Sequence, residues 1–228
     1  MIAAPYPRFR PAGDSALLVE LGAAIDPALN RMVHAFDRRL GASAPPGIVE
    51  TVPAYCSVLI HYDPMQLTTA AVTRWAESAA ESLEITPEEA ARPVEIPTVY
   101  GGDAGPDLGF VAQAHGLSPA EVVRLHSGAE YTVYMMGFLP GFAYLGGLPA
   151  ELATPRLAAP RAHVAAGSVG IAGAQTGVYP LDSPGGWRII GRTALRLFDP
   201  RHDPPAHLRP GDRVRFVSVQ AEAAGHGA

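Results

Sequence analysis

The stretch from Tyr131 to Phe198 reads YTVYMMGFLPGFAYLGGLPAELATPRLAAPRAHVAAGSVGIAGAQTGVYPLDSPGGWRIIGRTALRLF, and it decides the fold. Glycine, proline and aromatic residues recur every few positions, and no part of it has helical periodicity. Glycine loses the most chain entropy on folding and gives a core no side chain, so packing does not explain its density here. The pattern predicts short strands and tight turns that shape the backbone around something it approaches closely.

The residues on either side of this stretch complete a second domain. A strand is predicted over residues 94–100, and two short helices over 107–115 and 118–126, the latter opened by a capping box of Ser118 and Glu121. Near the end, PGDRVRFVSV predicts a turn followed by an alternating strand. Many short strands with glycine corners are typical of a closed or nearly closed β-barrel.

The first part of the chain alternates strand-like and helix-like segments. Strands are predicted over residues 15–21, 48–55 and 56–62, and a helix over 69–83. The clearest helix is predicted from Asp26, as N-cap, to Leu40, with Gly41 ending it. This pattern predicts a small α+β sandwich, a sheet with two helices on one face.

The glycine distribution predicts where one domain ends and the other begins. Twenty of the 24 glycines lie at or after Gly101, and the segment ITPEEAARPVEIP has the charge and proline of a linker. We therefore expect an α+β N-terminal domain over residues 1–90, a β-barrel domain over 91–220 and a disordered tail over 221–228.

Composition excludes several function classes. The net charge of -5 argues against a nucleic-acid surface, and no apolar run reaches bilayer length. The beginning, MIAAPYPRFRPAGD, lacks the apolar core of a signal peptide, and Cys56 is the single cysteine, so a cytoplasmic protein is expected. No nucleic-acid or membrane partner is predicted.

All 17 basic residues are arginine, and the chain has no lysine. It therefore has no Schiff-base lysine, no P-loop lysine and no lysine to carry biotin. A bound phosphate or carboxylate has to be met by arginine, by backbone amides or by a metal.

Three arginines are candidates for holding such an anion. Arg156 and Arg161 stand five residues apart in the two Pro-Arg pairs of PRLAAPR, and Arg192 follows in IIGRT. Proline stiffens the backbone beside the first two, which favours a bidentate clamp. The alternative is that these arginines are surface residues or salt-bridge partners.

Two glycine-rich segments carry further candidates. AGSVGIAGAQTGVYP combines glycines with Ser168, Gln175 and Tyr179, whose side chains supply oriented hydrogen bonds. In SPGGW, the amides of Gly185 and Gly186 are able to line the same pocket, and the following tryptophan is predicted to be a core residue or to border the site. The alternative for these glycines is a place at strand corners, and their spacing matches no nucleotide-binding motif.

His126 is the histidine best placed for acid–base chemistry, at the end of a helix just before the barrel. The alternative is a capping role at the helix C-terminus. His202 and His207 do not predict a metal site, because two prolines separate them and no cysteine or further histidine nearby completes a ligand set.

Taken together, YMMGFLPGFAYLGGLP, PRLAAPR, AAGSVGIAGAQTGVYPLDSPGGW and IIGRT resemble the allophanate hydrolase subunit 1 family, whose members include the B component of 5-oxoprolinase and the kinase A inhibitor. GDSALLVELG, VPAYCSVLIHYDP and YGGDAGPDLG are similar to the family as well, so the resemblance covers nearly the whole chain. It implies an α+β fold, with a small N-terminal domain and a cyclophilin-like β-barrel of the carboxyltransferase type.

The resemblance also implies a function. The chain is expected to be the B component of an ATP-dependent 5-oxoprolinase, inactive alone. Its expected partners are the C component, a homologue of allophanate hydrolase subunit 2, and the A component, and together they convert 5-oxo-L-proline to L-glutamate. ATP with Mg²⁺ is expected at the level of the complex, with no covalently bound cofactor. The alternatives are an inhibitor of a sensor histidine kinase and the carboxyltransferase component of a urea amidolyase type system.

Residue chemistry and motif position then assign hypothetical roles. Arg156, Arg161 and Arg192 are expected to hold phosphate or carboxylate, with the Gly185 and Gly186 amides beside them. Ser168 is expected to orient the substrate amide together with Gln175 and Tyr179, and these last two and His126 are the catalytic candidates.

Overall fold

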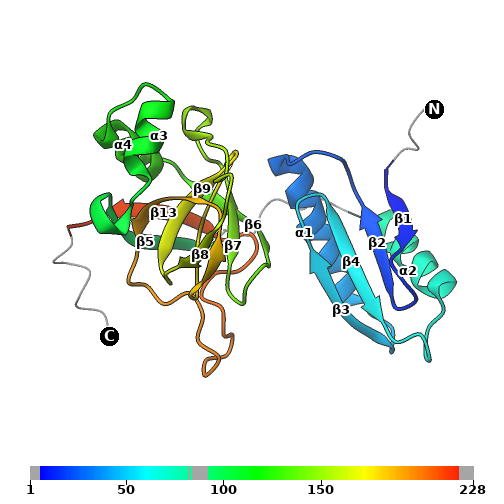
Figure 1. The fold of residues 1–228 in the computed structure, drawn as a ribbon. Coiled ribbons are helices and arrows are strands. Elements are labelled where there is room, and N and C mark those ends of the chain that lie inside the picture. Colours follow the sequence, from blue (N-terminus) through cyan, green and yellow to red (C-terminus); the bar gives the residue numbers. More distant parts are fainter. Residues whose placement is uncertain (1–5, 82, 84–91, 221–228) are drawn as a thin grey trace. The chain divides into compact units, whose positions relative to one another are not determined.

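The computed structural model describes residues 6–81, 83 and 92–220. The chain forms two compact units, Met1–Glu89 and Ala90–Ala228, drawn in Figure 1. The predicted boundary near residue 90 and the predicted tail over 221–228 lie outside the described residues.

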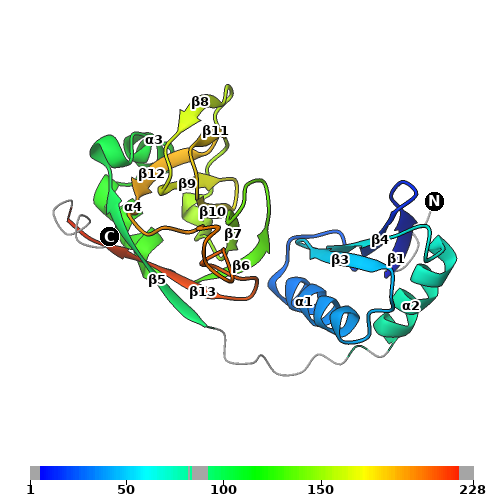
Figure 2. The same cartoon turned by 90° about the horizontal axis from the view of Figure 1, so that it is seen from below.

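The N-terminal unit is a four-stranded antiparallel sheet in the order β1-β2-β4-β3. Its strands are β1 (Arg8–Pro11), β2 (Ala16–Glu20), β3 (Ile48–Pro53) and β4 (Ser57–Tyr62), and its helices are α1 (Pro27–Ala42) and α2 (Thr69–Glu81). Figure 2 shows both helices on one face of the sheet, where their apolar sides pack on alternate strand residues. The predicted α+β sandwich is confirmed.

The ends of α1 show where local signals hold and where they fail. Asp26 caps the helix as predicted, since its Oδ1 accepts the Leu29 amide at 2.9 Å. The prediction that Gly41 ends the helix is wrong, because the helix continues to Ala42 and Ser43 is the C-cap. A helical glycine costs only about 1 kcal/mol relative to alanine, which packing of the helix face easily offsets. Strand β1 was not predicted, because four residues with a terminal proline carry little pattern.

The C-terminal unit is a closed barrel of seven strands in the order β10-β7-β6-β13-β5-β12-β9. The strands are β5 (Pro93–Tyr100), β6 (Tyr131–Met136), β7 (Ala143–Gly146), β9 (Ser168–Ala172), β10 (Gln175–Val178), β12 (Arg188–Arg192) and β13 (Arg213–Ser218). Neighbouring strands are antiparallel except for β13 and β5, which run parallel. Closure gives each strand a neighbour on both sides, and it confirms the predicted barrel.

Smaller elements lie outside the barrel wall. They are the helices α3 (Leu108–Ala114) and α4 (Pro119–Gly128), the 3₁₀ turns η1 (Gly102–Ala104) and η2 (Ala150–Leu152), and the two-stranded ribbon of β8 (Arg161–Val164) with β11 (Ser183–Gly185). The predicted capping box of α4 is present, because the Ser118 hydroxyl accepts the Glu121 amide and Glu121 accepts the Ser118 amide at 2.7 Å. No helix in the described ranges is long and apolar enough to cross a bilayer.

Two separate apolar clusters hold this unit together. The larger fills the barrel and the space under α3 and α4. The smaller, which we call the aromatic cluster, is formed by Phe142, Val164, Ala172, Tyr179, Trp187 and Ile189, with Leu139 and Tyr144 packed against it. The β8–β11 ribbon packs on this cluster through Val164 of β8. Trp187 is 5% exposed, which confirms its predicted position in the core.

Candidate functional site

Arg156 and Arg161 both lie beside the aromatic cluster. The Arg156 guanidinium carbon is 5.9 Å from the centroid of the Trp187 ring, within the range of a cation–π contact. Arg161 donates from Nη2 to Asp107 Oδ1 at 2.8 Å and from Nη1 to the Trp187 carbonyl at 3.3 Å. The structure therefore gives Arg161 the salt-bridge role weighed as its alternative, and leaves Arg156 exposed above the indole.

Tyr179 lies in the same cluster and packs against the predicted glycines. Its side chain is buried, and its phenol oxygen lies where a Cβ on Gly185 would be 2.4 Å away. Burial raises the pKa of Tyr179, while the Trp187 amide and the charges of Arg156 and Arg161 oppose that rise. Gly185 is thus a glycine because the phenol occupies its side-chain space.

Phe138 extends this cluster to the surface. The residue is 60% exposed, and its ring stands edge-on to Phe142, with centroids 5.6 Å apart, and to Tyr179 at 6.5 Å. It is the one non-glycine residue with positive φ, at 73°, in the part of the chain that the structure describes. Holding a phenylalanine in the left-handed region costs about 1–2 kcal/mol, so the surrounding fold imposes this conformation.

Arg192 lies elsewhere, on the wall of a pocket of about 910 Å³. Its Nε donates to the Ala166 carbonyl at 3.1 Å. The same wall contains Gly167, whose φ of 81° and close approach to the Thr193 carbonyl, 2.1 Å from the position of a Cβ, admit only glycine. The pocket is also lined by Val99, Ala104, Ala166, Pro180, Leu181, Thr193, Ala194, Leu195, Arg196, Phe198, Asp199, Pro200 and Arg201. We call it the Arg192 pocket.

Ser168 and Gln175 fall at opposite ends of the β9–β10 hairpin. Ser168 is opposite Arg192 on β12, and its carbonyl accepts the Tyr179 amide. Gln175 pairs with Ala172 at the turn, four residues before Tyr179, which in an extended strand is about 13 Å. The structure therefore brings Ser168 close to Arg192, while Gln175 stands apart from both.

His126 is fully buried among barrel residues. Its Nδ1 is 2.7 Å from the Tyr100 hydroxyl, and its Nε2 is 2.9 Å from the Thr176 hydroxyl. The Phe216 ring lies against it, with centroids 4.5 Å apart. Burial lowers the pKa of His126 to about 3, so the ring is neutral near pH 7. Its catalytic role stays a prediction that this geometry does not favour, because both ring nitrogens already have partners.

The structure also shows polar residues that the motifs did not single out. Asp107 is buried and ties Arg161 to the Ile189 amide, which it accepts at 2.6 Å. Asp199 is contacted by the side chains of Arg196, Arg201 and His202. The signal available in the sequence was the charge density of FDPRHDPP inside a proline-rich loop. No group of three or more His, Cys, Asp or Glu side chains is placed to hold a metal ion in the described ranges.

Comparison with known proteins relates this arrangement to a family. The model of the carboxyltransferase domain, subdomain C and D, matches residues 7–208. The B component of 5-oxoprolinase from Escherichia coli O157:H7 is 48% identical over 206 residues, which cover 90% of this chain and 93% of that protein. The protein of the same name from Bacillus subtilis (strain 168) is 44% identical over 221 residues, covering 91% and 90%.

A solved structure extends the similarity to three dimensions. The crystal structure of TTHA0988 matches with a TM-score of 0.79 at 38% identity, over 90% of this chain and 40% of that chain. The seven-stranded barrel is the cyclophilin-like barrel implied by the resemblance. The chain therefore belongs to the carboxyltransferase domain family, subdomain C and D, as its motifs predicted.

Proposed function

We propose that this chain is the B component of a 5-oxoprolinase. The observation that carries the proposal is its similarity, at 44–48% identity and over at least nine tenths of each chain, to two proteins that bear this name. In the proposed complex the chain acts with a C component and an A component, and 5-oxo-L-proline is opened to L-glutamate. The chain is expected to be inactive alone.

The chemistry of the substrate supports a requirement for ATP. A five-membered lactam is resonance-stabilised, and its amide nitrogen is a poor leaving group at neutral pH. Transfer of the γ-phosphoryl group of ATP to the lactam oxygen turns that oxygen into a leaving group, with release of ADP. Addition of one water to the activated carbon and departure of the ring nitrogen as an amine open the ring to an acyl phosphate. A second water then displaces the phosphate, so that one ATP and two waters give glutamate, ADP and phosphate. ATP with Mg²⁺ enters this proposal at the level of the complex.

The residues of this chain fit the handling of anions in such a reaction. With no lysine, a carboxylate or phosphate is met by guanidinium groups and backbone amides, and Arg192 lies on a pocket wall with Gly167. Ser168 is the polar neighbour of Arg192 across the β9–β12 ladder. Arg156, which is exposed above Trp187 of the aromatic cluster, offers a second position for contact with substrate or with another component of the complex.

Reconstitution tests the proposal. The chain is purified alone and with the C and A components from the same genome, and glutamate release from 5-oxo-L-proline is measured with and without ATP. We expect release only in the complete mixture with ATP, and at least tenfold less with Arg192→Gln. Arg215→Gln, which removes an exposed arginine of β13 that is not among the residues lining the pocket, is the matched control. A complete mixture without activity would contradict the proposal.

The two alternatives, kinase inhibition and a carboxyltransferase component, stay predictions. Autophosphorylation assays with the histidine kinases of the same organism test the first. The second requires a biotin-carrying partner, because this chain has no lysine.

A further inference from the structure

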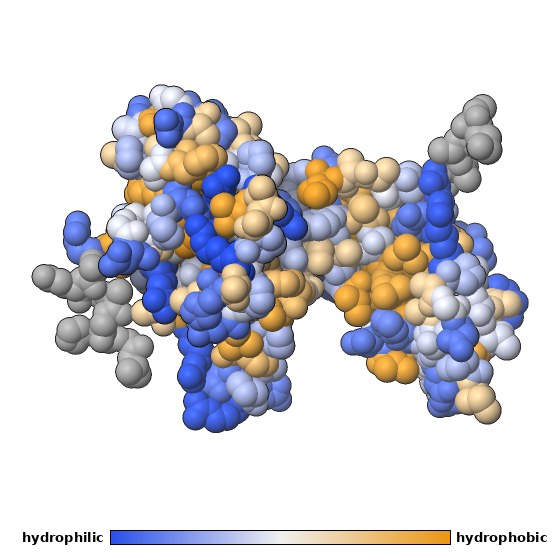
Figure 3. All heavy atoms as spheres, in the orientation of Figure 1, coloured by the Kyte–Doolittle hydropathy of each residue, from blue (hydrophilic) through white to orange (hydrophobic). Residues whose placement is uncertain are grey.

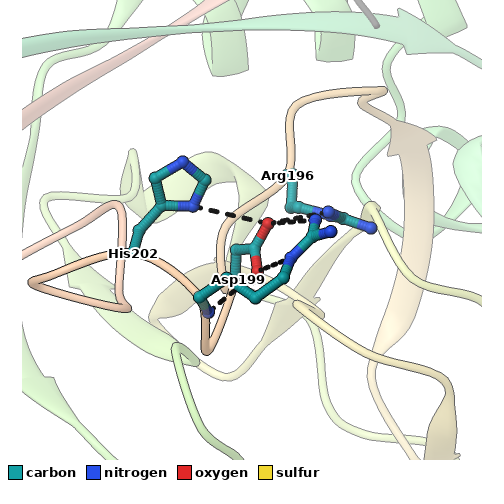
Figure 4. A network of polar contacts seen from close by, with 4 residues as sticks. Arg196, Asp199 and His202 are labelled. Atoms are coloured by element: carbon teal, nitrogen blue, oxygen red, sulfur yellow. Dashed lines mark hydrogen bonds and ion pairs between the residues drawn. The ribbon is translucent and has the colours of Figure 1, made fainter.

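One buried carboxylate, that of Asp199, organises the basic side chains beside the Arg192 pocket. Arg201 forms a bidentate pair with it, from Nε to Oδ1 at 3.0 Å and from Nη2 to Oδ2 at 2.8 Å. Arg196 donates from Nη1 to the same Oδ2 at 2.8 Å, and His202 Nδ1 is 3.4 Å away. Figure 4 shows Arg196 and His202 pointing toward the Asp199 carboxylate, whose side chain is 9% exposed.

One carboxylate does not balance the positive charge on this pocket. Among the described residues that line it are three guanidinium groups, those of Arg192, Arg196 and Arg201, against the single carboxylate of Asp199. Asp182, which is exposed and interacts with Arg192, offsets part of the surplus at the edge. Hydrogen bonds from Arg201 and Arg196 hold the pKa of Asp199 well below its usual range, so it stays ionised. Two guanidinium groups on one carboxylate repel each other, and an incoming anion relieves that repulsion.

The arginines also keep donors for a ligand. Within the described residues, the hydrogen bonds of Arg192 come from Nε alone and those of Arg196 from Nη1 alone. Arg201 uses its backbone amide, Nε and Nη2. Both Nη groups of Arg192, Nη2 of Arg196 and Nη1 of Arg201 are therefore available for charge-assisted hydrogen bonds.

The rest of the pocket is apolar and roomy. Leu181, Leu195 and Phe198 contribute to its lining. A volume of about 910 Å³ is near the top of the usual range for small-molecule sites and much larger than a five-membered lactam requires. The loop that carries Asp199 and its partners, orange in Figure 1 below the barrel, presents a hydrophilic surface in Figure 3.

We propose that the Arg192 pocket binds a phosphorylated small molecule. Its phosphate lies on Arg192, Arg196 and Arg201, and its uncharged part lies on the apolar wall. Asp199 is a positioning residue that holds Arg196 and Arg201 in place without touching the ligand. The choice of adenosine nucleotides as probes rests on the proposed function, whereas the site itself rests on the geometry.

Calorimetric titration of the full chain tests the site directly, without the other components. ADP is expected to bind, inorganic phosphate to bind more weakly, and adenosine to bind least. Arg196→Gln and Arg201→Gln are each expected to weaken ADP binding at least tenfold, whereas Arg215→Gln, an equal loss of charge on β13, changes it less than twofold. Absence of binding by both ADP and phosphate, or an equal effect of Arg215→Gln, would overturn the proposal. Displacement of ADP by 5-oxo-L-proline would also overturn it, since the pocket would then be a carboxylate site.

Asp199→Asn separates positioning from net charge. Simple electrostatics predicts tighter ADP binding when a negative charge leaves the pocket, whereas a positioning role predicts binding at least tenfold weaker. Thermal unfolding checks that the variant is folded, and if it is not, the exposed Arg196→Gln decides alone. If the chain binds ADP but the reconstituted mixture releases no glutamate, the proposed function is contradicted and the site is retained. If the mixture releases glutamate but the chain does not bind ADP, the site is contradicted and the proposed function is retained.

Discussion

The phenol oxygen of Tyr179 occupies the space that a side chain on Gly185 would fill, 2.4 Å from the position of its Cβ. Tyr179 is buried in the aromatic cluster, and Gly185 belongs to the ribbon that the cluster carries. The two residues, which the sequence placed in one candidate site, are therefore in direct contact. The position of the Tyr179 phenol requires a glycine at residue 185.

This contact predicts that Gly185→Ala destabilises the chain. The added methyl group has to displace Tyr179 from a packed cluster, which costs roughly 1–3 kcal/mol. Gly186→Ala is the matched control, since its Cβ would meet Pro160 at an ordinary 3.7 Å. Urea unfolding measures both, and equal free energies of unfolding for the two variants would contradict the packing argument.

Gly167→Ala is expected to damage the wall of the Arg192 pocket. The position has φ of 81°, and the new Cβ would lie 2.1 Å from the Thr193 carbonyl oxygen, so strain and collision add to more than about 3 kcal/mol. Gly173→Ala has a similar φ of 57° with nothing within 4 Å, and costs only the conformational part, about 1 kcal/mol. Thermal unfolding of the pair distinguishes collision from strain.

The strained loop at Phe138 predicts an unusual order of stability. Phe138→Gly and Phe138→Ala lose the same ring contacts, but only glycine adopts a φ of 73° without cost. The glycine variant is therefore expected to be more stable than the alanine variant by about 1 kcal/mol. Denaturant midpoints measure this difference, and the opposite order would show that the backbone relaxes once the ring is removed.

The buried His126 predicts a pH dependence of stability. Its pKa is about 3 in the folded chain and near 6.5 when unfolded, so between these values the unfolded state binds the extra proton. Stability contributed by the neutral ring is complete above pH 6.5 and falls as the pH decreases, by up to about 1.4 kcal/mol per unit. Free energies of unfolding at pH 7 and pH 5 are expected to differ less in His126→Gln than in the unchanged chain. An identical difference would mean that the folded state binds the His126 proton as readily as the unfolded state does.

The Asp107–Arg161 pair predicts a difference between the two arginines of PRLAAPR. Arg161→Met leaves a buried carboxylate with the Ile189 amide as its remaining partner, and is expected to cost about 1–2 kcal/mol, discounted for the partial exposure of the arginine. Arg156→Met loses only the contact above Trp187, worth about 0.5 kcal/mol. Chemical unfolding of both variants measures the order.

Local signals determined most of the fold. The cap at Asp26, the capping box of Ser118 and Glu121, and the glycine-rich run after Tyr131 each depend on a few neighbouring residues. Pattern alone therefore predicted α1 and α4, which carry these caps, and the barrel. The ordering of barrel strands did not follow from pattern, because β13 pairs with β5 across more than a hundred residues. Such pairing depends on the closed sheet as a whole.

The candidate site divides in the same way. The sequence by itself determined the chemistry, since a chain without lysine meets anions with arginines and backbone amides, and it placed that chemistry in the glycine-rich barrel. Only the tertiary structure decided which residues meet. It set Arg161 against Asp107, buried the His126 side chain against barrel residues and gathered Arg196 and Arg201 on Asp199 beside Arg192. Contacts of this kind depend on strand register and on loop conformation, which bring together residues that lie far apart in the sequence.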